Sequence, residues 1–141
     1  MKALLTALLA AATSAAAAAE FTIVCPDRLP ASALRLTGQP KGWQGSINAP
    51  LFLHNAEPTD GPPEDLGRMI GEAGNAKNKA WVTRYPLTGD FSRGKWLTCD
   101  YGMLNEVSLA KRLPDDTKEC TVTGRKGEYA GQNQFSIVCR N

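Results

Sequence analysis

Apolar and polar residues alternate in short runs along this chain, and a period of two predicts β-strands. The runs with this pattern cover residues 21–25, 80–85, 95–101, 120–122 and 135–139, with weaker candidates at 43–47 and 51–54. Thirteen glycines and nine prolines interrupt the pattern and keep the runs short. The sequence therefore predicts a mainly β fold built from short strands.

The two halves of the chain differ in their residue patterns. Residues 20–78 are rich in loop signals, whereas the strands from residue 79 onward follow one another as in an antiparallel meander. Residues 64–76 carry apolar side chains at helical spacing, but three glycines would each cost a helix about 1 kcal/mol relative to alanine, so we predict a single turn or an ordered loop. We expect a small antiparallel β-sheet, as a sandwich or a partly open barrel, with a loop-rich N-terminal half.

A reversal of the chain near residue 104 would form a hairpin in the second half. Cys99 and Tyr101 share one face of their predicted strand, and Val107 and Leu109 would return opposite Tyr101 and Cys99. A helix over residues 104–113 is the alternative interpretation of the same segment.

The last two predicted strands align in one register. With a loop at residues 125–133, three positions on one face pair across the hairpin: Cys120 with Cys139, Val122 with Ile137, and Gly124 with Phe135. Opposite residues at a non-hydrogen-bonded position lie near the distance that a disulfide requires. Among the three pairings that four cysteines permit, we therefore prefer Cys120 with Cys139 and Cys25 with Cys99.

The spacing of the cysteines also limits their chemistry. The smallest gap is 19 residues, so there is no C-x-x-C redox motif, and a single histidine leaves zinc without its usual ligands. We interpret all four cysteines as structural and predict no metal site.

An export signal opens the chain. Lys2 precedes an apolar segment at residues 3–12 and an alanine run at 15–19, which suits cleavage after Ala19. The apolar segment is shorter than the roughly 20 residues that span a bilayer, and no later segment reaches that length, so we predict no membrane span. We expect a signal peptide at residues 1–19, a single disulfide-stapled β domain at 20–141, and a periplasmic or secreted location, where cysteines pair.

Charge argues against a nucleic-acid partner. Without the signal, 15 basic residues stand against 14 acidic ones, and no basic stripe suited to phosphates is visible.

Candidate catalytic residues are few. His54 closes an apolar segment, and no serine or cysteine motif marks a nucleophile to accompany it, so we interpret it as a strand-end residue with ordinary hydrogen bonds. The adjacent acidic pairs at 64–65 and 115–116 stand beside prolines, where carboxylates commonly decorate turns. The glycines at 67, 71 and 74 lack a nucleotide-binding fingerprint. We therefore predict no catalytic residue and no cofactor, and expect that the protein is not an enzyme.

Aromatic residues are the remaining candidates for binding. Trp43, Trp81 and Trp96 lie in or beside predicted strands, where large aromatic side chains usually pack in a core or at an edge. Tyr129 and its neighbour Glu128 lie at the tip of the last hairpin, where an exposed tyrosine can anchor a partner protein, although it can also fold back over its own loop. We take Tyr129, Glu128 and Trp43 as candidate binding residues.

The order of several short motifs resembles the STY-type family of exported, uncharacterised bacterial proteins. These motifs are Cys25-Pro26, Gly42-Trp43, Asp60-Gly61-Pro62, Trp81, the run from Trp96 to Tyr101, Leu113-Pro114, Cys120 with Val122, and Cys139. The resemblance covers nearly the whole mature chain, and residues 67–79 depart from the pattern. It implies a small exported β domain with disulfides and transfers no catalytic residue.

Two functional hypotheses follow from the sequence. The first is an exported binding protein whose partner is a protein of the cell envelope, as an inhibitor or accessory factor of an envelope-acting enzyme such as lysozyme. The second is a small periplasmic hydrolase that uses His54 or scattered carboxylates, and a purely structural envelope role is a further alternative. We favour the binding protein.

Overall fold

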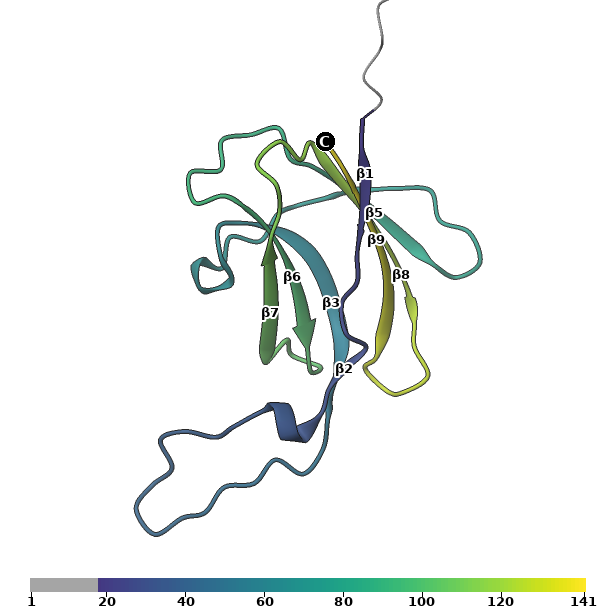
Figure 1. The fold of residues 1–141 in the computed structure, drawn as a ribbon. Helices are drawn as coiled ribbons and strands as arrows, with labels where there is room; N and C mark the ends of the chain where they lie inside the picture. The colour runs from purple at the N-terminus through teal and green to yellow at the C-terminus, as the bar shows by residue number, and fades with distance from the viewer. Residues whose placement is uncertain (1–17) are drawn as a thin grey trace, which may run out of the picture.

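The structure is a computed structural model that describes residues 18–141. The predicted signal peptide lies almost entirely outside the described residues, so the signal and the domain boundary after it stay predictions. Nine strands and two short 3-10 helices follow one another along the chain (Figure 1). They are β1 (Glu20–Ile23), β2 (Arg28–Leu29), η1 (Ala31–Ala33), β3 (Leu51–Asp60), η2 (Pro63–Asp65), β4 (Glu72–Ala73), β5 (Trp81–Pro86), β6 (Lys95–Tyr101), β7 (Val107–Arg112), β8 (Glu119–Lys126) and β9 (Asn133–Arg140).

The strands form two antiparallel sheets that face each other and do not close into a barrel. One sheet has the order β1-β9-β8-β5-β4 and the other has the order β2-β3-β6-β7. The chain changes sheet after β5 and again after β7, so the second half is a sandwich rather than a simple meander. The mainly β fold with a loop-rich N-terminal half is confirmed.

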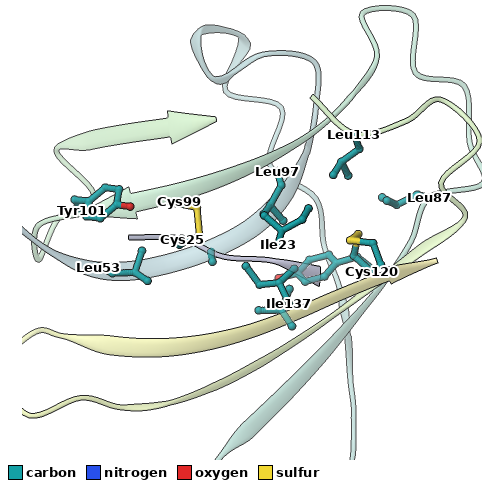
Figure 2. Close-up of a cluster of buried hydrophobic side chains, with 14 of the residues drawn as sticks. Ile23, Cys25, Leu53, Leu87, Leu97, Cys99, Tyr101, Leu113, Cys120 and Ile137 are labelled. Atoms are coloured by element: carbon teal, nitrogen blue, oxygen red, sulfur yellow. A yellow bond between two sulfur atoms is a disulfide. The ribbon is translucent and has the colours of Figure 1, made fainter. Parts of the chain in front are cut away.

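Apolar side chains from both sheets meet in the space between them (Figure 2). Leu97 and Tyr101 alternate on the inward face of β6, and Val122 and Ile137 oppose each other on the inward faces of β8 and β9. All four are at most 2% exposed, as expected where strands bury one face and expose the other.

The terminal hairpin has the predicted register. β8 and β9 pair Cys120 with Cys139, Val122 with Ile137 and Gly124 with Phe135. Both predicted disulfides are present. Cys120–Cys139 lies within this hairpin, and Cys25–Cys99 joins two residues that are 74 positions apart in the sequence. Since β1 belongs to one sheet and β2 to the other, the second disulfide fixes the crossing segment to the inward face of β6.

The chain reversal after β6 is also confirmed. Val107 lies opposite Tyr101 and Leu109 lies opposite Cys99. The alternative helix over residues 104–113 is wrong, because residues 107–112 form a strand that pairs with residues 96–101 of β6.

The predicted strand at 43–47 is wrong, because these residues lie in the long loop between η1 and β3 and have no strand partner. The candidate at 51–54 is confirmed and extends to Asp60, because β6 pairs with β3 along its length. Residues 64–76 contain the end of η2 and the two-residue strand β4, in agreement with a turn and an ordered loop.

No helix among the described residues is long and apolar enough to cross a membrane.

Candidate interaction surface

Three loops lie at one end of the sandwich, which we call the loop end. They are the β2–β3 connection at residues 30–50, the β6–β7 turn at residues 102–106 and the β8–β9 loop at residues 127–132 (Figure 1). The start of β3 lies between the last two, and a pocket of about 240 Å³ there is lined by Phe52 of β3 and by residues of both loops, including Met103 and Gly131. The fold thus brings together segments that are far apart in the sequence.

Exposed apolar side chains gather at this end. The rings of Phe52 and Tyr129 stack with centroids 4.7 Å apart and an interplanar angle of 13°. Tyr129 remains 51% exposed, and Met103 and Leu104 in the neighbouring turn are 67% and 85% exposed. We call Phe52, Met103, Leu104 and Tyr129 the aromatic platform. Stable interfaces commonly centre on such aromatic and sulfur-containing side chains.

Hydrogen bonds fix the β8–β9 loop against β3. His54 donates from Nδ1 to the carbonyl of Gly131 at 2.7 Å, and Asn133 donates from Nδ2 to the carbonyl of His54 at 2.6 Å. Within the loop, the side-chain oxygen of Gln132 accepts bonds from the backbone N–H groups of Glu128 and Tyr129, both at 3.1 Å. These bonds hold the backbone that carries Tyr129, and the stack on Phe52 positions its ring.

The β6–β7 turn is tied to the same strand. The N–H of Gly102 donates to the carbonyl of Phe52 at 3.0 Å, and the Glu106 carboxylate accepts a bond from the N–H of Leu104 at 3.0 Å. Gly102 has a φ of 88°, which favours glycine, and a Cβ there would collide with the Glu106 carboxylate. The turn that carries Met103 and Leu104 is therefore held in place as well.

The β2–β3 connection projects from the body of the sandwich (Figure 1), and we call residues 34–50 the arm. Trp43 on the arm is 75% exposed. The arm has contacts of its own: Gln39 donates to the carbonyl of Leu36 at 2.9 Å, and the N–H of Trp43 donates to the carbonyl of Pro40 at 3.0 Å. A Cβ on Gly45 would lie 2.6 Å from Leu36, so the outgoing and returning parts of the arm pack closely.

The structure brings two of the three candidate binding residues together. Tyr129 and Glu128 share the β8–β9 loop, and Tyr129 packs on Phe52 rather than over its own loop. Trp43 belongs to the loop end but lies on the arm, outside the Phe52–Tyr129 stack. Sequence reasoning missed the other members of the platform, since an isolated Met-Leu pair after a strand gives no signal of where the turn will dock.

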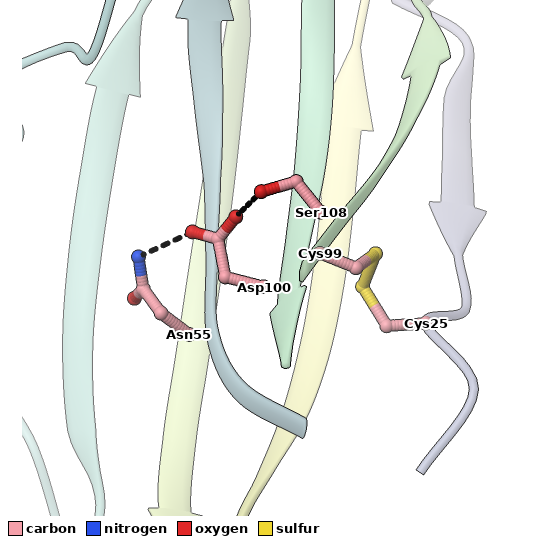
Figure 3. The surroundings of a disulfide bond; sticks show 5 residues. All are labelled: Cys25, Asn55, Cys99, Asp100 and Ser108. Atoms are coloured by element: carbon pink, nitrogen blue, oxygen red, sulfur yellow. Dashed lines mark hydrogen bonds between the residues drawn. A yellow bond between two sulfur atoms is a disulfide. The ribbon is translucent and has the colours of Figure 1, made fainter. Parts of the chain in front are cut away.

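A cluster of polar side chains lies on the outward face of the β2-β3-β6-β7 sheet. Asp100 is fully buried and accepts bonds from Ser108 Oγ at 2.6 Å, Arg68 Nη1 at 2.9 Å and Asn55 Nδ2 at 3.4 Å (Figure 3 shows the Ser108 and Asn55 bonds). Arg68 also pairs with Glu57, and its hydrogen bond with Asp100 raises the pKa of the guanidinium above its ordinary value. This arrangement keeps the carboxylate of Asp100 compensated, so we assign it a structural role.

The candidate catalytic groups do not assemble. The hydrogen bonds of the His54 side chain and carbonyl run to the β8–β9 segment, Asp65 pairs with Arg93, and Asp115 pairs with Arg112. Within residues 18–141, no group of three or more histidine, cysteine, aspartate or glutamate side chains is placed to hold a metal ion.

Comparison with known proteins gives one family. The family model described as "Type VI secretion system Tli immunity protein" matches residues 48–140, which include every residue of the aromatic platform. The match does not test the STY-type label, which stays a resemblance. No curated protein and no solved structure matches the chain.

Proposed function

Because the chain belongs to the type VI secretion system Tli immunity protein family, we propose that it binds a toxic effector of that system and neutralises it without catalysis. The sequence favours an inhibitor of an envelope-acting enzyme, and this proposal makes the target more specific, namely a delivered toxin. The binding surface in this proposal is the aromatic platform at the loop end.

The observation that carries the proposal is the stack of Phe52 and Tyr129 beside Met103 and Leu104. The stacked rings lie beside the pocket that Phe52 and Met103 line, and exposed Leu104 follows Met103 in the same turn. Disulfides and hydrogen bonds fix the sandwich that carries them. A surface held in its bound shape loses little conformational entropy on association, which favours tight binding. An immunity protein needs such affinity, because each unbound toxin molecule remains active.

The compartment in the proposal is the periplasm. The predicted export signal and the two disulfides fit an oxidising compartment, where a neutralising protein would meet a toxin delivered from a neighbouring cell.

Self-protection in co-culture tests the function. A strain that lacks this gene should be killed by its own parent strain, and a plasmid copy of the gene should restore survival. A parent with an inactivated secretion system is the control and should kill neither strain. Equal survival of the deletion strain and its parent, with the secretion system active, would contradict the proposal.

Substitution of Tyr129 tests the platform. Tyr129→Ala removes the stack on Phe52 and should weaken binding of the purified toxin at least about tenfold, whereas Tyr129→Phe keeps the stack and should bind nearly as the unmodified chain does. Ile70→Ala, which removes an exposed apolar side chain outside the loop end, is the matched control. The toxin is identified beforehand as the effector whose deletion from the attacking strain abolishes killing. Unchanged affinity of Tyr129→Ala would exclude the platform as the binding surface.

A further inference from the structure

The arm differs from the rest of the molecule in its charge. Residues 34–50 contain Arg35 and Lys41 and no aspartate or glutamate, whereas the whole chain has 14 acidic and 16 basic residues. Both cationic side chains are exposed, and neither takes part in a salt bridge among residues 18–141. The arm is therefore a projecting segment with free positive charge.

The arm also carries an apolar anchor. Trp43 is 75% exposed, while the other two tryptophans, Trp81 and Trp96, are only partly exposed within strands. An exposed tryptophan leaves a large apolar area in contact with water. Tryptophan is also among the side chains that contribute most binding energy when a partner covers them.

The arm's length and internal contacts indicate a role of its own. A loop of more than about 12 to 15 residues without secondary structure is uncommon unless it is functional or disordered. This one is held by the Gln39–Leu36 and Trp43–Pro40 bonds and by the close approach of Gly45 to Leu36. Its exposed anchor is thus presented by a defined backbone.

Most of the arm lies outside the segment that matches the family model. The matched segment begins at residue 48, so it contains the platform but leaves out Arg35, Lys41 and Trp43. A segment outside the shared region can differ between family members without disturbing the sandwich, which suits a determinant of partner choice.

We propose that the arm binds an acidic surface of the toxin, with Trp43 inserted in an apolar recess and Arg35 and Lys41 paired with carboxylates around it. This inference rests on the proposed function and adds the chemistry of the partner. In this proposal the platform supplies most of the affinity, and the arm selects the toxin through complementary charge, which governs association rate and discrimination between partners.

A protein partner fits the arm better than a membrane does. Segments that bind anionic lipid headgroups commonly hold about four to eight basic residues, whereas the arm holds two. An aromatic ring that the partner would bury, with two cations on the same segment, matches the apolar centre and polar rim of a protein interface.

The test measures binding of the full mature chain to the purified toxin that the co-culture deletions identify. Trp43→Ala should weaken affinity at least about tenfold. The double variant Arg35→Glu with Lys41→Glu should also weaken it at least about tenfold at 50 mM salt, and the loss should shrink at 500 mM because salt screens exposed charges. Lys118→Glu together with Lys77→Glu makes the same charge change outside the arm and is the matched control.

The outcomes separate this inference from the proposed function. If the unmodified chain binds the toxin and both arm variants bind equally tightly with unchanged melting temperatures, the arm inference is overturned and the immunity function stands. If the control double variant loses as much affinity as the arm variant, overall charge rather than the arm decides binding, which also overturns it. Binding of the unmodified chain to vesicles of anionic phospholipid that disappears in Trp43→Ala, with toxin affinity unchanged, would assign the arm to a membrane instead. Failure of the unmodified chain to bind or neutralise any effector would overturn both proposals.

Discussion

At the scale of single residues, one arginine compensates a buried carboxylate. Asp100 is fully buried on the outward face of β6, and Arg68, which reaches it from the segment after η2, is 41% exposed. Removing one member of a buried ion pair leaves the other without compensation, which costs more than the pair itself contributes.

We therefore predict that Arg68→Ala lowers the free energy of unfolding by about 2 to 3 kcal/mol, a value reduced for the solvent exposure of Arg68. Arg112→Ala breaks the exposed pair with Asp115 and is the control, with an expected loss below about 1 kcal/mol. Urea denaturation measures both. Equal losses in the two variants would contradict a structural role for the Asp100 network.

A buried tyrosine makes stability depend on alkaline pH. Tyr101 is fully buried, its hydroxyl has no hydrogen-bond partner among the described residues, and burial raises its pKa to about 12 from an ordinary value of 10.0. The unfolded chain therefore ionises Tyr101 at lower pH than the folded protein does. The contribution of Tyr101 to stability is intact below pH 10 and is lost as the pH rises from about 10 towards 12.

Tyr101→Phe should consequently change stability by less than about 1 kcal/mol at pH 7, because it removes an unpaired hydroxyl. It should also reduce the loss of stability between pH 10 and 12. Part of the loss will remain, since burial raises the pKa of Tyr85 too. Unfolding curves at pH 7, 10 and 11.5 provide the comparison. A variant that is strongly destabilised at pH 7 would show that the hydroxyl has a partner.

Residues at the candidate surface were only partly predictable. Tyr129 and Trp43 stand out because a large aromatic side chain among glycines has no obvious core to join. In the sequence, Phe52 has the pattern of an ordinary strand residue. Its contact with Tyr129, 77 positions further along the chain, depends on how the terminal hairpin docks. Contacts of this kind are set by tertiary packing, which periodicity does not encode.

At the scale of elements, strict alternation made the terminal hairpin predictable. Cysteine, valine and isoleucine at every second position allow one register that puts all the apolar side chains on one face. The strand predicted at 43–47 failed because no neighbouring strand pairs with it, and β3 continues past His54 through polar residues because β6 supplies its hydrogen bonds. Pairing therefore decides strand length where local pattern is weak.

Gly124 in this hairpin leaves room for an aromatic ring. It faces inward opposite Trp81, and a Cβ there would lie 2.3 Å from the indole, which in turn packs edge-on against Phe135. Gly124→Val should lower the free energy of unfolding by about 1 to 3 kcal/mol through overpacking.

Thr121→Val, on the outward face of the same strand, provides the control and should change stability by less than about 0.5 kcal/mol. Thermal unfolding measures both variants. A neutral Gly124→Val would indicate that Trp81 can leave its position without cost.

At the scale of the whole molecule, the division into two sheets was not predictable. β5 and β6 follow each other in sequence but belong to different sheets, and β1 pairs with the last strand of the chain. These choices depend on which apolar faces meet over long separations. The Cys25–Cys99 disulfide, which was predicted by pairing the other two cysteines first, was the one long-range restraint in the sequence.

Hydrogen–deuterium exchange of the chain alone and in complex with its toxin tests the central claim most directly. If the loop end is the surface of an immunity protein, the toxin should slow amide exchange in residues 34–50, 102–106 and 127–132, and should leave the turn between β7 and β8, at residues 113–118, unchanged. Protection at residues 113–118 with none at the three loops, or no change anywhere at saturating toxin, would contradict the account.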